Sequence, residues 1–318
     1  MRTDRFCLSA LTFATLFTIG PRADAFCRTS TGGLRNGCTI GGTECCTIGK
    51  PLFWKNACVG YSLQKDASRQ VSYDDAASGL TAAFSKWTGT SCPTDGTGRS
   101  LVSIDVRDLG PVACGAVEYN KDGPNQHVIA FRDDTWTHMD SNNTLALTTV
   151  TFSPDSGEIF DADMEVNTAQ QHITVKDPIP ADGFDFASII THETGHFLGL
   201  AHSTDASATM FAHYKQGATA MRNLKGDDVS GICAIYPPNG TRNVDTGSVP
   251  EDVCDPTPRH GFTKDCGAPA TTKGCQVGLV GALRGDETRG PGSALFAIGA
   301  IGALGLARAS RRRTPPRR

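Results

Sequence analysis

Residues 192–202 read His-Glu-Thr-Gly-His-Phe-Leu-Gly-Leu-Ala-His, and their spacing constrains the local fold more than any other feature of the chain. On a helix, His192 and His196 are four residues apart and therefore project from one face. Gly199 lets the chain leave the helix in a backbone conformation that is open mainly to glycine. The turn that follows can return His202 to the first two histidines. The pattern predicts a helix over about 185–198 and, after it, a turn that gathers three imidazoles.

Three neutral imidazoles are a typical ligand set for Zn²⁺ and leave a fourth position open, as in catalytic rather than structural zinc sites. We therefore predict His192, His196 and His202 as ligands of one zinc ion. Glu193 lies beside them, where it can act as general base on a zinc-bound water. The alternative is a set of surface histidines on an ordinary helix, but five fixed residues at fixed spacing rarely arise by chance.

The chain also resembles the metzincin metalloproteases, and within them the secreted bacterial matrixins. Ser203 follows the third histidine, Met210 lies eight residues after His202, and Tyr214 lies four residues after Met210. The resemblance covers about residues 52–238 and includes the runs 131–134, 157–167 and 227–237.

The resemblance implies an α+β fold of the zincin type, with a twisted, mostly parallel sheet of about five strands, three helices and an active-site cleft. It implies that Gly199, Met210 and Tyr214 support the site, Met210 in a turn beneath the zinc and Tyr214 beside the substrate residue after the cut bond. An extended substrate would pair with the strand over 145–152. The implied activity is that of a zinc metalloendopeptidase that hydrolyses protein substrates.

The sequence departs from the matrixin pattern in three respects. The P-R-C-G segment whose cysteine plugs the zinc is absent, so latency by that route is not predicted. Thr148, Thr149 and Ile159 stand where a second, structural zinc would need histidines, so no second zinc is predicted. Ca²⁺ is possible at Asp161 or Asp163, although a solvated acidic strand face is the favoured interpretation.

Other polar residues have simpler interpretations. The remaining histidines lack ligand spacing and are predicted to lie on the surface or in loops; they are His127, His138, His172, His213 and His260. Asp228 is either a helix-start residue or a partner for the active-site helix or the new N-terminus, and the sequence leaves both open.

Hydrophobic periodicity predicts the remaining elements. Ser72 and Asp75 form a helix-start signal, and the apolar stripe after it is predicted to be core: Ala76, Leu80, Phe84 and Trp87. Strands are expected over 52–63, 101–106, 127–132, 145–152 and 159–166, and a last helix is expected near Gly226.

The two ends of the chain have compositions unlike the middle. Residues 1–25 have a basic start, a short apolar run and an A-x-A site, which predict a secretory signal peptide. Residues 276–318 contain a short apolar run followed by an Arg cluster, which predicts an anchoring tail and resembles a myxobacterial sorting signal. Between them we expect a Cys-rich segment over 26–51, the catalytic domain over 52–238 and a linker over 239–275.

Ten cysteines remain between the signal and Cys275, and an even number in an exported chain predicts a disulfide set whose pairing stays open. A zinc site built from these cysteines is the alternative, but no paired C-x2-C spacing supports it.

Charge constrains the partners. The chain carries −3 overall, with +6 in residues 284–318 and +1 in residues 1–25, which leaves −10 for residues 26–283. An acidic domain argues against nucleic acid as a partner. We expect a secreted or cell-surface monomer that acts on proteins or peptides and contacts a membrane only through its tail. The alternatives are a non-catalytic, zinc-stabilised binding module and a zinc hydrolase with a non-peptide substrate.

Overall fold

A computed structural model describes residues 26–32, 49–93, 98, 100–238, 240, 242–244, 247–249, 253–264 and 276–286. In the last three strands only the backbone is described, apart from the side chains of Arg242, Leu283 and Arg284. The predicted signal peptide and the apolar run of the predicted tail lie outside the described residues. The helices of the described part include none that is long and apolar enough to cross a membrane.

Seven strands form the main sheet in the order β2-β1-β3-β5-β4-β11-β8. Their bounds are β1 Cys58–Leu63, β2 Asp105–Asp108, β3 Val128–Phe131, β4 Thr144–Phe152, β5 Ile159–Val166, β8 His213–Lys215 and β11 Gln276–Asp286. Pairing is parallel among β2, β1, β3 and β5, antiparallel for β4 with both of its neighbours, and parallel between β11 and β8. Two small sheets pair β6 Ile173–Thr174 with β7 Phe184–Asp185, and β9 Arg242–Val244 with β10 Gly247–Val249. The mostly parallel sheet of the predicted α+β fold is confirmed.

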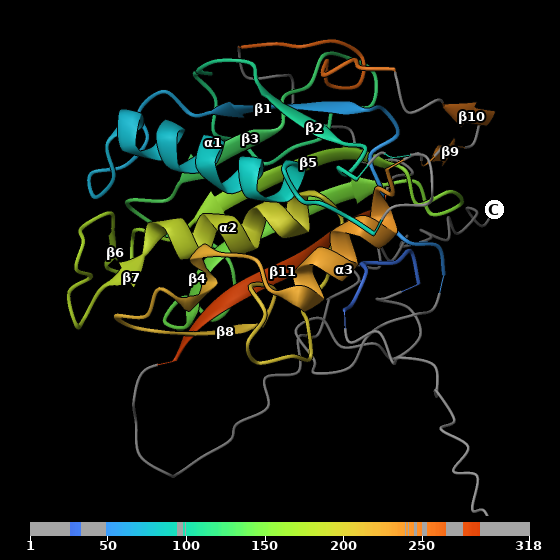
Figure 1. Cartoon of the computed structure of the whole chain (residues 1–318). Helices are drawn as coiled ribbons and strands as arrows, with labels where there is room; N and C mark the ends of the chain where they lie inside the picture. The colour runs from blue at the N-terminus through green and yellow to red at the C-terminus, as the bar shows by residue number, and fades with distance from the viewer. Residues whose placement is uncertain are drawn as a thin grey trace, which may run out of the picture. The chain divides into compact units, whose positions relative to one another are not determined.

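Within the described residues, three α-helices accompany the sheet: α1 Tyr73–Thr88, α2 Phe186–Phe197 and α3 Gly226–Ile235, with a short 3-10 helix η1 at Ala220–Arg222. α1 and α2 lie against each other over the sheet (Figure 1). Ser72 caps α1 by accepting a hydrogen bond from the Asp75 amide at 3.2 Å, as its sequence signal predicts.

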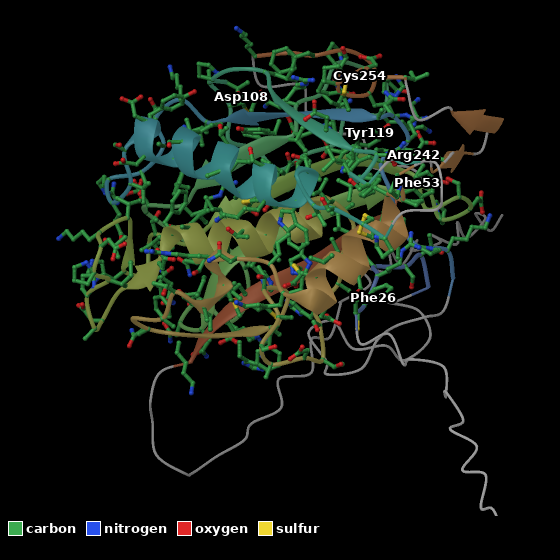
Figure 2. All side chains as sticks on the ribbon, in the orientation of Figure 1. Phe26, Phe53, Asp108, Tyr119, Arg242 and Cys254 are labelled. Carbon is green, nitrogen blue, oxygen red and sulfur yellow. A yellow bond between two sulfur atoms is a disulfide. The ribbon has the colours of Figure 1, made fainter. Side chains whose placement is uncertain are left out.

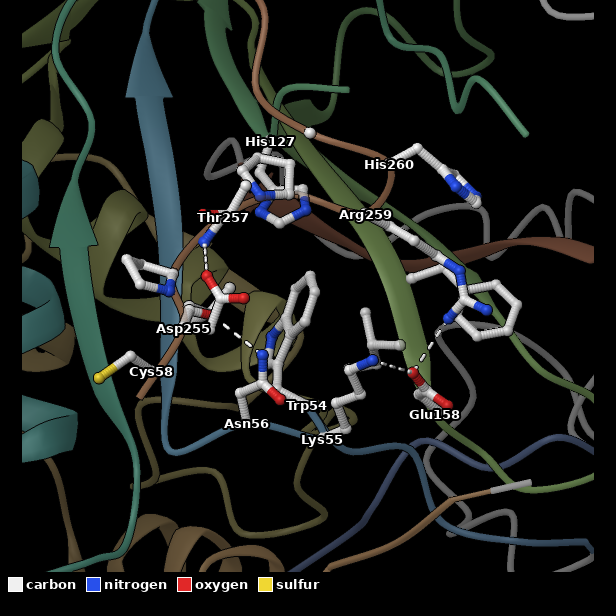
Figure 3. A pocket seen from close by; sticks show the side chains of 16 residues that line it. Trp54, Lys55, Asn56, Cys58, His127, Glu158, Asp255, Thr257, Arg259 and His260 are labelled. Carbon is white, nitrogen blue, oxygen red and sulfur yellow. Dashed lines mark hydrogen bonds and ion pairs between the residues drawn. The ribbon is translucent and has the colours of Figure 1, made fainter. Parts of the chain in front are cut away.

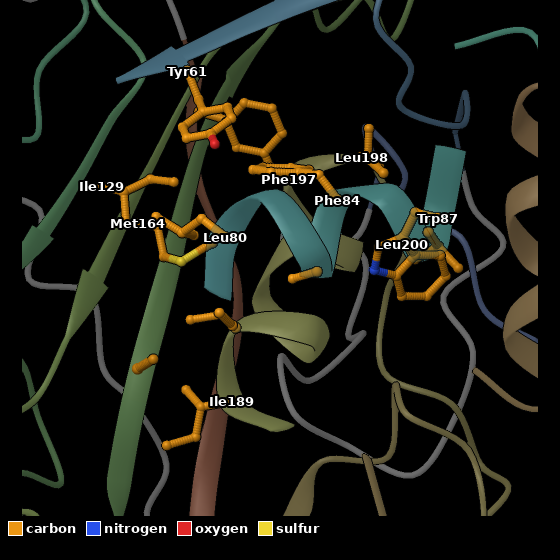
Figure 4. Close-up of a cluster of buried hydrophobic side chains, with 14 of the residues drawn as sticks. Tyr61, Leu80, Phe84, Trp87, Ile129, Met164, Ile189, Phe197, Leu198 and Leu200 are labelled. Atoms are coloured by element: carbon orange, nitrogen blue, oxygen red, sulfur yellow. The ribbon is translucent and has the colours of Figure 1, made fainter. Parts of the chain in front are cut away.

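The predicted apolar stripe of α1 forms part of the core. All four of its side chains are buried, and Phe84 meets Phe197 of α2 edge to face at 5.2 Å between ring centroids (Figure 4). The Trp87 indole N–H donates to the Thr191 carbonyl at 2.9 Å and thereby joins α1 to α2. Because both contacts fall on the helix that carries the histidine motif, α1 fixes the position of α2 against the sheet.

The acidic face of β5 differs from its predicted state. Asp161, Asp163 and Glu165 share one face, but each is at most 3% exposed, so the expectation of a solvated face is wrong. Asp163 accepts hydrogen bonds from the backbone amides of Val128 and Glu118 at 2.7 and 3.1 Å. Burial raises the pKa of both Asp161 and Asp163 well above the usual range. The alternating acids therefore face the interior, where the Glu118 amide of loop 109–127 meets Asp163, and Arg132 and His138 meet Glu165.

His127 is also a correction, since it is 3% exposed rather than at the surface. Its Nδ1 lies 2.7 Å from the Gly60 carbonyl, so this nitrogen carries the proton, and burial lowers the pKa to about 4. His138 is half-buried and lies 2.6 Å from Glu165. His172, His213 and His260 are exposed, as predicted.

Two disulfides join distant parts of the chain, Cys58–Cys254 and Cys92–Cys233 (Cys254 is labelled in Figure 2). Cys27 and Cys114 are also disulfide-bonded. The Cys92–Cys233 bridge links the segment after α1 to α3, and so fastens the first and last helices of the domain to each other.

Candidate metal centre

Helix α2 presents the first half of the histidine motif. Asp185 caps it by accepting from the Ser188 amide at 3.0 Å, and His192, Glu193 and His196 are fully buried. The helix ends at Phe197 with Leu198 as its C-cap, and Gly199 follows at φ +99°. A β-carbon at Gly199 would also lie 2.8 Å from the Leu52 carbonyl oxygen, so both backbone angle and space require glycine there.

The turn after Gly199 brings His202 to the other two histidines. One nitrogen from each imidazole lies within 4.8 Å of the others, and among the described residues this is the group that could hold a metal ion. The structure thus gathers the three predicted ligands into one place.

The tautomers show why a cation fits here. Nδ1 of His192 lies 2.7 Å from the Thr209 carbonyl, and Nδ1 of His196 lies 2.9 Å from the Leu200 carbonyl. A carbonyl only accepts, so each Nδ1 carries the proton and each Nε2 presents a lone pair. The two Nε2 atoms are 3.0 Å apart, and His202 Nε2 is buried with no hydrogen-bond partner in the described part of the chain. Lone pairs this close repel each other unless a cation lies between them.

Burial also keeps these imidazoles neutral. Desolvation lowers the pKa of His192 and His202 well below the usual value and that of His196 to about 4. Zinc binds neutral imidazole, so no proton has to leave at neutral pH before the metal can enter.

Glu193 lies beside this cluster in a desolvated position. Burial raises its pKa to about 8, while the Thr148 hydroxyl and the backbone amide of Leu283 act in the opposite direction. Thr148 on β4 donates to Oε2 at 2.6 Å. Oε1 has no hydrogen-bond partner of normal geometry among the residues that the structure describes, although the Leu283 amide lies close by. One carboxylate oxygen is therefore held in place and the other is free to take a proton.

Met210 lies beneath α2. It is 1% exposed, and a β-carbon at Gly195 of α2 would come within 2.3 Å of its sulfur. The absence of a side chain at Gly195 is what lets the methionine turn approach the helix. Tyr214 on β8 is buried, its hydroxyl donates to the Ala218 carbonyl, and its ring lies 6.2 Å from Phe184.

Asp228 at the start of α3 holds the methionine turn from the other side. Its carboxylate accepts from the backbone amides of Thr209, Met210 and Lys225 at 2.8, 3.0 and 2.8 Å. Thr209 is the residue whose carbonyl orients His192. Asp228 therefore fits both interpretations that the sequence left open. It is a helix-start residue, and it also holds Thr209, whose carbonyl is the hydrogen-bond partner of His192.

Replacing Asp228 by Asn should lower the free energy of unfolding by about 2–3 kcal/mol, because an amide group would face backbone N–H donors. The Thr209 carbonyl would then hold His192 less firmly, and zinc affinity should fall about 10–100-fold. Denaturant unfolding and zinc titration measure the two effects. Asp227→Asn is the matched control, because Asp227 accepts from the Ser203 hydroxyl at 2.5 Å and Asn can still accept there. Equal effects of the two substitutions would contradict the assignment.

Sequence reasoning missed Thr148 and Gly195. The sequence singles out Thr148 only as a position where a second, structural zinc would need a histidine. Nothing in the strand pattern indicates that Thr148 faces Glu193 across the sheet–helix interface. Gly195 lies in the variable part of the H-E-x-x-H motif, where the spacing rule requires no particular residue.

Calcium at Asp161 or Asp163 stays a prediction. Asp163 uses its oxygens for backbone amides, and neither residue belongs to a metal-sized group among the described residues. A separate cavity of about 270 Å³ lies at the start of β5, between Trp54 and the segment 255–261 (Figure 3). Its main acid, Glu158, is already paired with Arg259 at 3.0 Å and Lys55 at 3.8 Å, and none of the predicted site residues lines it.

The sheet, the crossing helix and the three gathered imidazoles are consistent with the α+β fold of the metzincins. Comparison with known families points the same way: the matrixin model of the M10 peptidases matches residues 117–237, so this part of the chain is similar to the matrixins.

Short segments of several metalloproteinases are also similar in sequence to this chain. Human matrix metalloproteinase-20 is 49% identical over 57 residues, which is 18% of this chain and 12% of the relative. Human neutrophil collagenase is 41% identical over 69 residues, 22% of this chain and 15% of the relative. Metalloendoproteinase 1 of Glycine max is 41% identical over 86 residues, 27% of each chain. The matches thus span well under two thirds of the relatives' own lengths.

Proposed function

We propose that this protein is a zinc-dependent endopeptidase that hydrolyses peptide bonds of protein substrates. The observation that carries the proposal is the arrangement of three Nε2 lone pairs beside a buried carboxylate with one free oxygen. A structural zinc site would close its fourth position with another ligand and would not need a neighbouring base.

Each part of the site has a role in this reaction. His192, His196 and His202 would hold the zinc ion. Zinc bound there would polarise the carbonyl of the substrate and make water a stronger nucleophile at neutral pH. Glu193 accepts the proton of the attacking water through Oε1 and delivers it to the leaving amine nitrogen. Thr148 holds Oε2 and leaves Oε1 as the oxygen that takes up the proton.

We further infer where the enzyme acts. Residues 1–25 would direct export, so hydrolysis would take place outside the cell or at its surface. The disulfides suit that compartment, since such bonds persist in oxidising surroundings. The acidic net charge of residues 26–283 supports protein rather than nucleic-acid substrates. The tail would be the membrane contact, and the catalytic domain would act as a monomer.

Removal and return of zinc test the proposal. The oxidised protein, stripped of metal by a chelator, should bind about one zinc ion per chain, and hydrolysis of a labelled denatured protein should appear only with the metal. Zinc-loaded protein that cuts no peptide, both as the parent and after displacement of strand β11 by Leu283→Asp, would show a binding module instead. Hydrolysis that is unaffected by chelation would equally contradict the assignment.

A further inference from the structure

Strand β11 lies along the candidate metal centre. It pairs antiparallel with β4 from Gln276 opposite Phe152 to Arg284 opposite Thr144, and its last residues pair parallel with β8 (Figure 1). The Arg284 amide donates to the Ala212 carbonyl at 3.2 Å, just before β8. The chain therefore passes in extended form between the strand that carries Thr148 and the strand that carries Tyr214.

Of the two β11 side chains that the structure describes, that of Leu283 enters the interior. Its side chain is 0% exposed and belongs to the same hydrophobic cluster as Met210 and Tyr214, whereas the neighbouring Arg284 is exposed. Arg284 lies 3.8 Å from Asp140, a contact outside the cluster. The apolar side chain of Leu283 is thus sequestered, while that of its neighbour Arg284 is exposed to solvent.

The backbone of Leu283 lies at Glu193. Its amide is close enough to the Glu193 carboxylate to interact with it, and β11 contacts α2 along this stretch. In peptide hydrolysis the general base must return a proton to the amine nitrogen that leaves. The nitrogen that meets this requirement is that of Leu283, so the bond placed for cleavage is Ala282–Leu283.

We propose that β11 is an intramolecular substrate of this site, cut between Ala282 and Leu283. Water oxygen adds to the Ala282 carbonyl carbon, the bond from that carbon to the Leu283 nitrogen breaks, and the nitrogen takes up a proton through Glu193. The products are a carboxylate at Ala282 and a free amine at Leu283. This proposal rests on the proposed function.

Occupation of the site by β11 has a second effect before the cut. A tethered segment acts at an effective concentration in the millimolar range, and external substrates with KM values below that must compete with it. The intact chain is therefore held back by its own strand, and cleavage separates residues 283–318 from the domain. This supplies latency without the missing cysteine switch.

Self-cleavage is tested on the full exported chain, purified without metal and started by adding zinc. Mass spectrometry and N-terminal sequencing should find a fragment that begins with Leu283. Its rate of appearance should not change over a hundredfold dilution, because the reaction is intramolecular. Fragments that begin elsewhere, or a rate proportional to protein concentration, would overturn the proposal.

Leu283→Asp provides an independent readout. A carboxylate at a fully buried position is costly, so β11 should leave the site and the cut at 282–283 should disappear. The initial rate of external peptide hydrolysis, measured before the parent has cut itself, should be about tenfold or more above that of the parent. Leu101→Asp is the matched control, since Leu101 is 55% exposed and lies outside β11, and it should change neither result.

The outcomes separate the two proposals. External hydrolysis that is equal in the parent and Leu283→Asp, with no fragment from Leu283, would remove the self-substrate inference and leave the peptidase intact. Absence of hydrolysis in the zinc-loaded Leu283→Asp variant would remove the peptidase itself.

Discussion

Glu193→Gln should reduce kcat/KM for peptide hydrolysis by about 10³–10⁴-fold while leaving zinc binding at one ion per chain. Gln has nearly the same shape as Glu and can still accept the hydrogen bond from Thr148, so the local structure should persist. It cannot take the proton of the attacking water, and the chemical step loses its base. Zinc content by elemental analysis and initial rates on a fluorogenic peptide measure the two quantities.

Thr148→Val is the comparison for this substitution. It keeps the volume of Thr148 but removes the 2.6 Å hydrogen bond to Oε2, so Glu193 remains a base but is held less well. A loss of about tenfold in kcat/KM is expected, far smaller than for Glu193→Gln. If Glu193→Gln retained more than a tenth of the parent activity, another group would have to be the base.

Removal of the Cys92–Cys233 bridge, as Cys92→Ala with Cys233→Ala, should lower the free energy of unfolding by about 5 kcal/mol. The bridge spans 141 residues, and the entropy that a disulfide removes from the unfolded chain grows with the length of the loop it closes. A loss of this size is comparable to the whole stability of many domains. Denaturant unfolding of the oxidised proteins, with and without zinc, gives the difference.

The second disulfide provides a comparison for this prediction. Cys58–Cys254 spans 196 residues and ties the start of β1 to the segment 253–264. Its removal should cost a similar free energy of unfolding in the same entropic account. A change below about 1 kcal/mol for either pair would mean that strain in the folded state or residual structure in the unfolded chain offsets the entropy.

The parts of the fold that follow local rules could be predicted from sequence. The i, i+4 spacing of His192 and His196 predicts their shared helix face, and the need for a left-handed residue predicts Gly199 at the turn. The capping signal at Ser72 and the strict alternation over 159–166 give the start of α1 and the bounds of β5. Each of these depends on residues only a few positions apart.

Contacts between distant segments could not be predicted in this way. Alternation places Asp161 and Asp163 on one face of β5, but whether that face meets water depends on a loop some 40 residues earlier. Thr148 reaches Glu193 only because β4 packs beneath α2. β11 lies in a segment assigned to the tail by composition, where the sequence carries no strand signal strong enough to reveal its pairing with β4. The domain boundaries stay predictions.

All nine side chains of β4 are buried, and β11 occupies the backbone hydrogen-bonding groups on one of its sides. Displacement of β11 would uncover a long row of amides and carbonyls on a strand without charged side chains, which is the kind of surface on which other chains add as further strands. Protein in which β11 no longer covers β4 should therefore be more prone to self-association than the intact chain. A bound peptide substrate would cover the same row of β4, so self-association and substrate binding would compete for one surface.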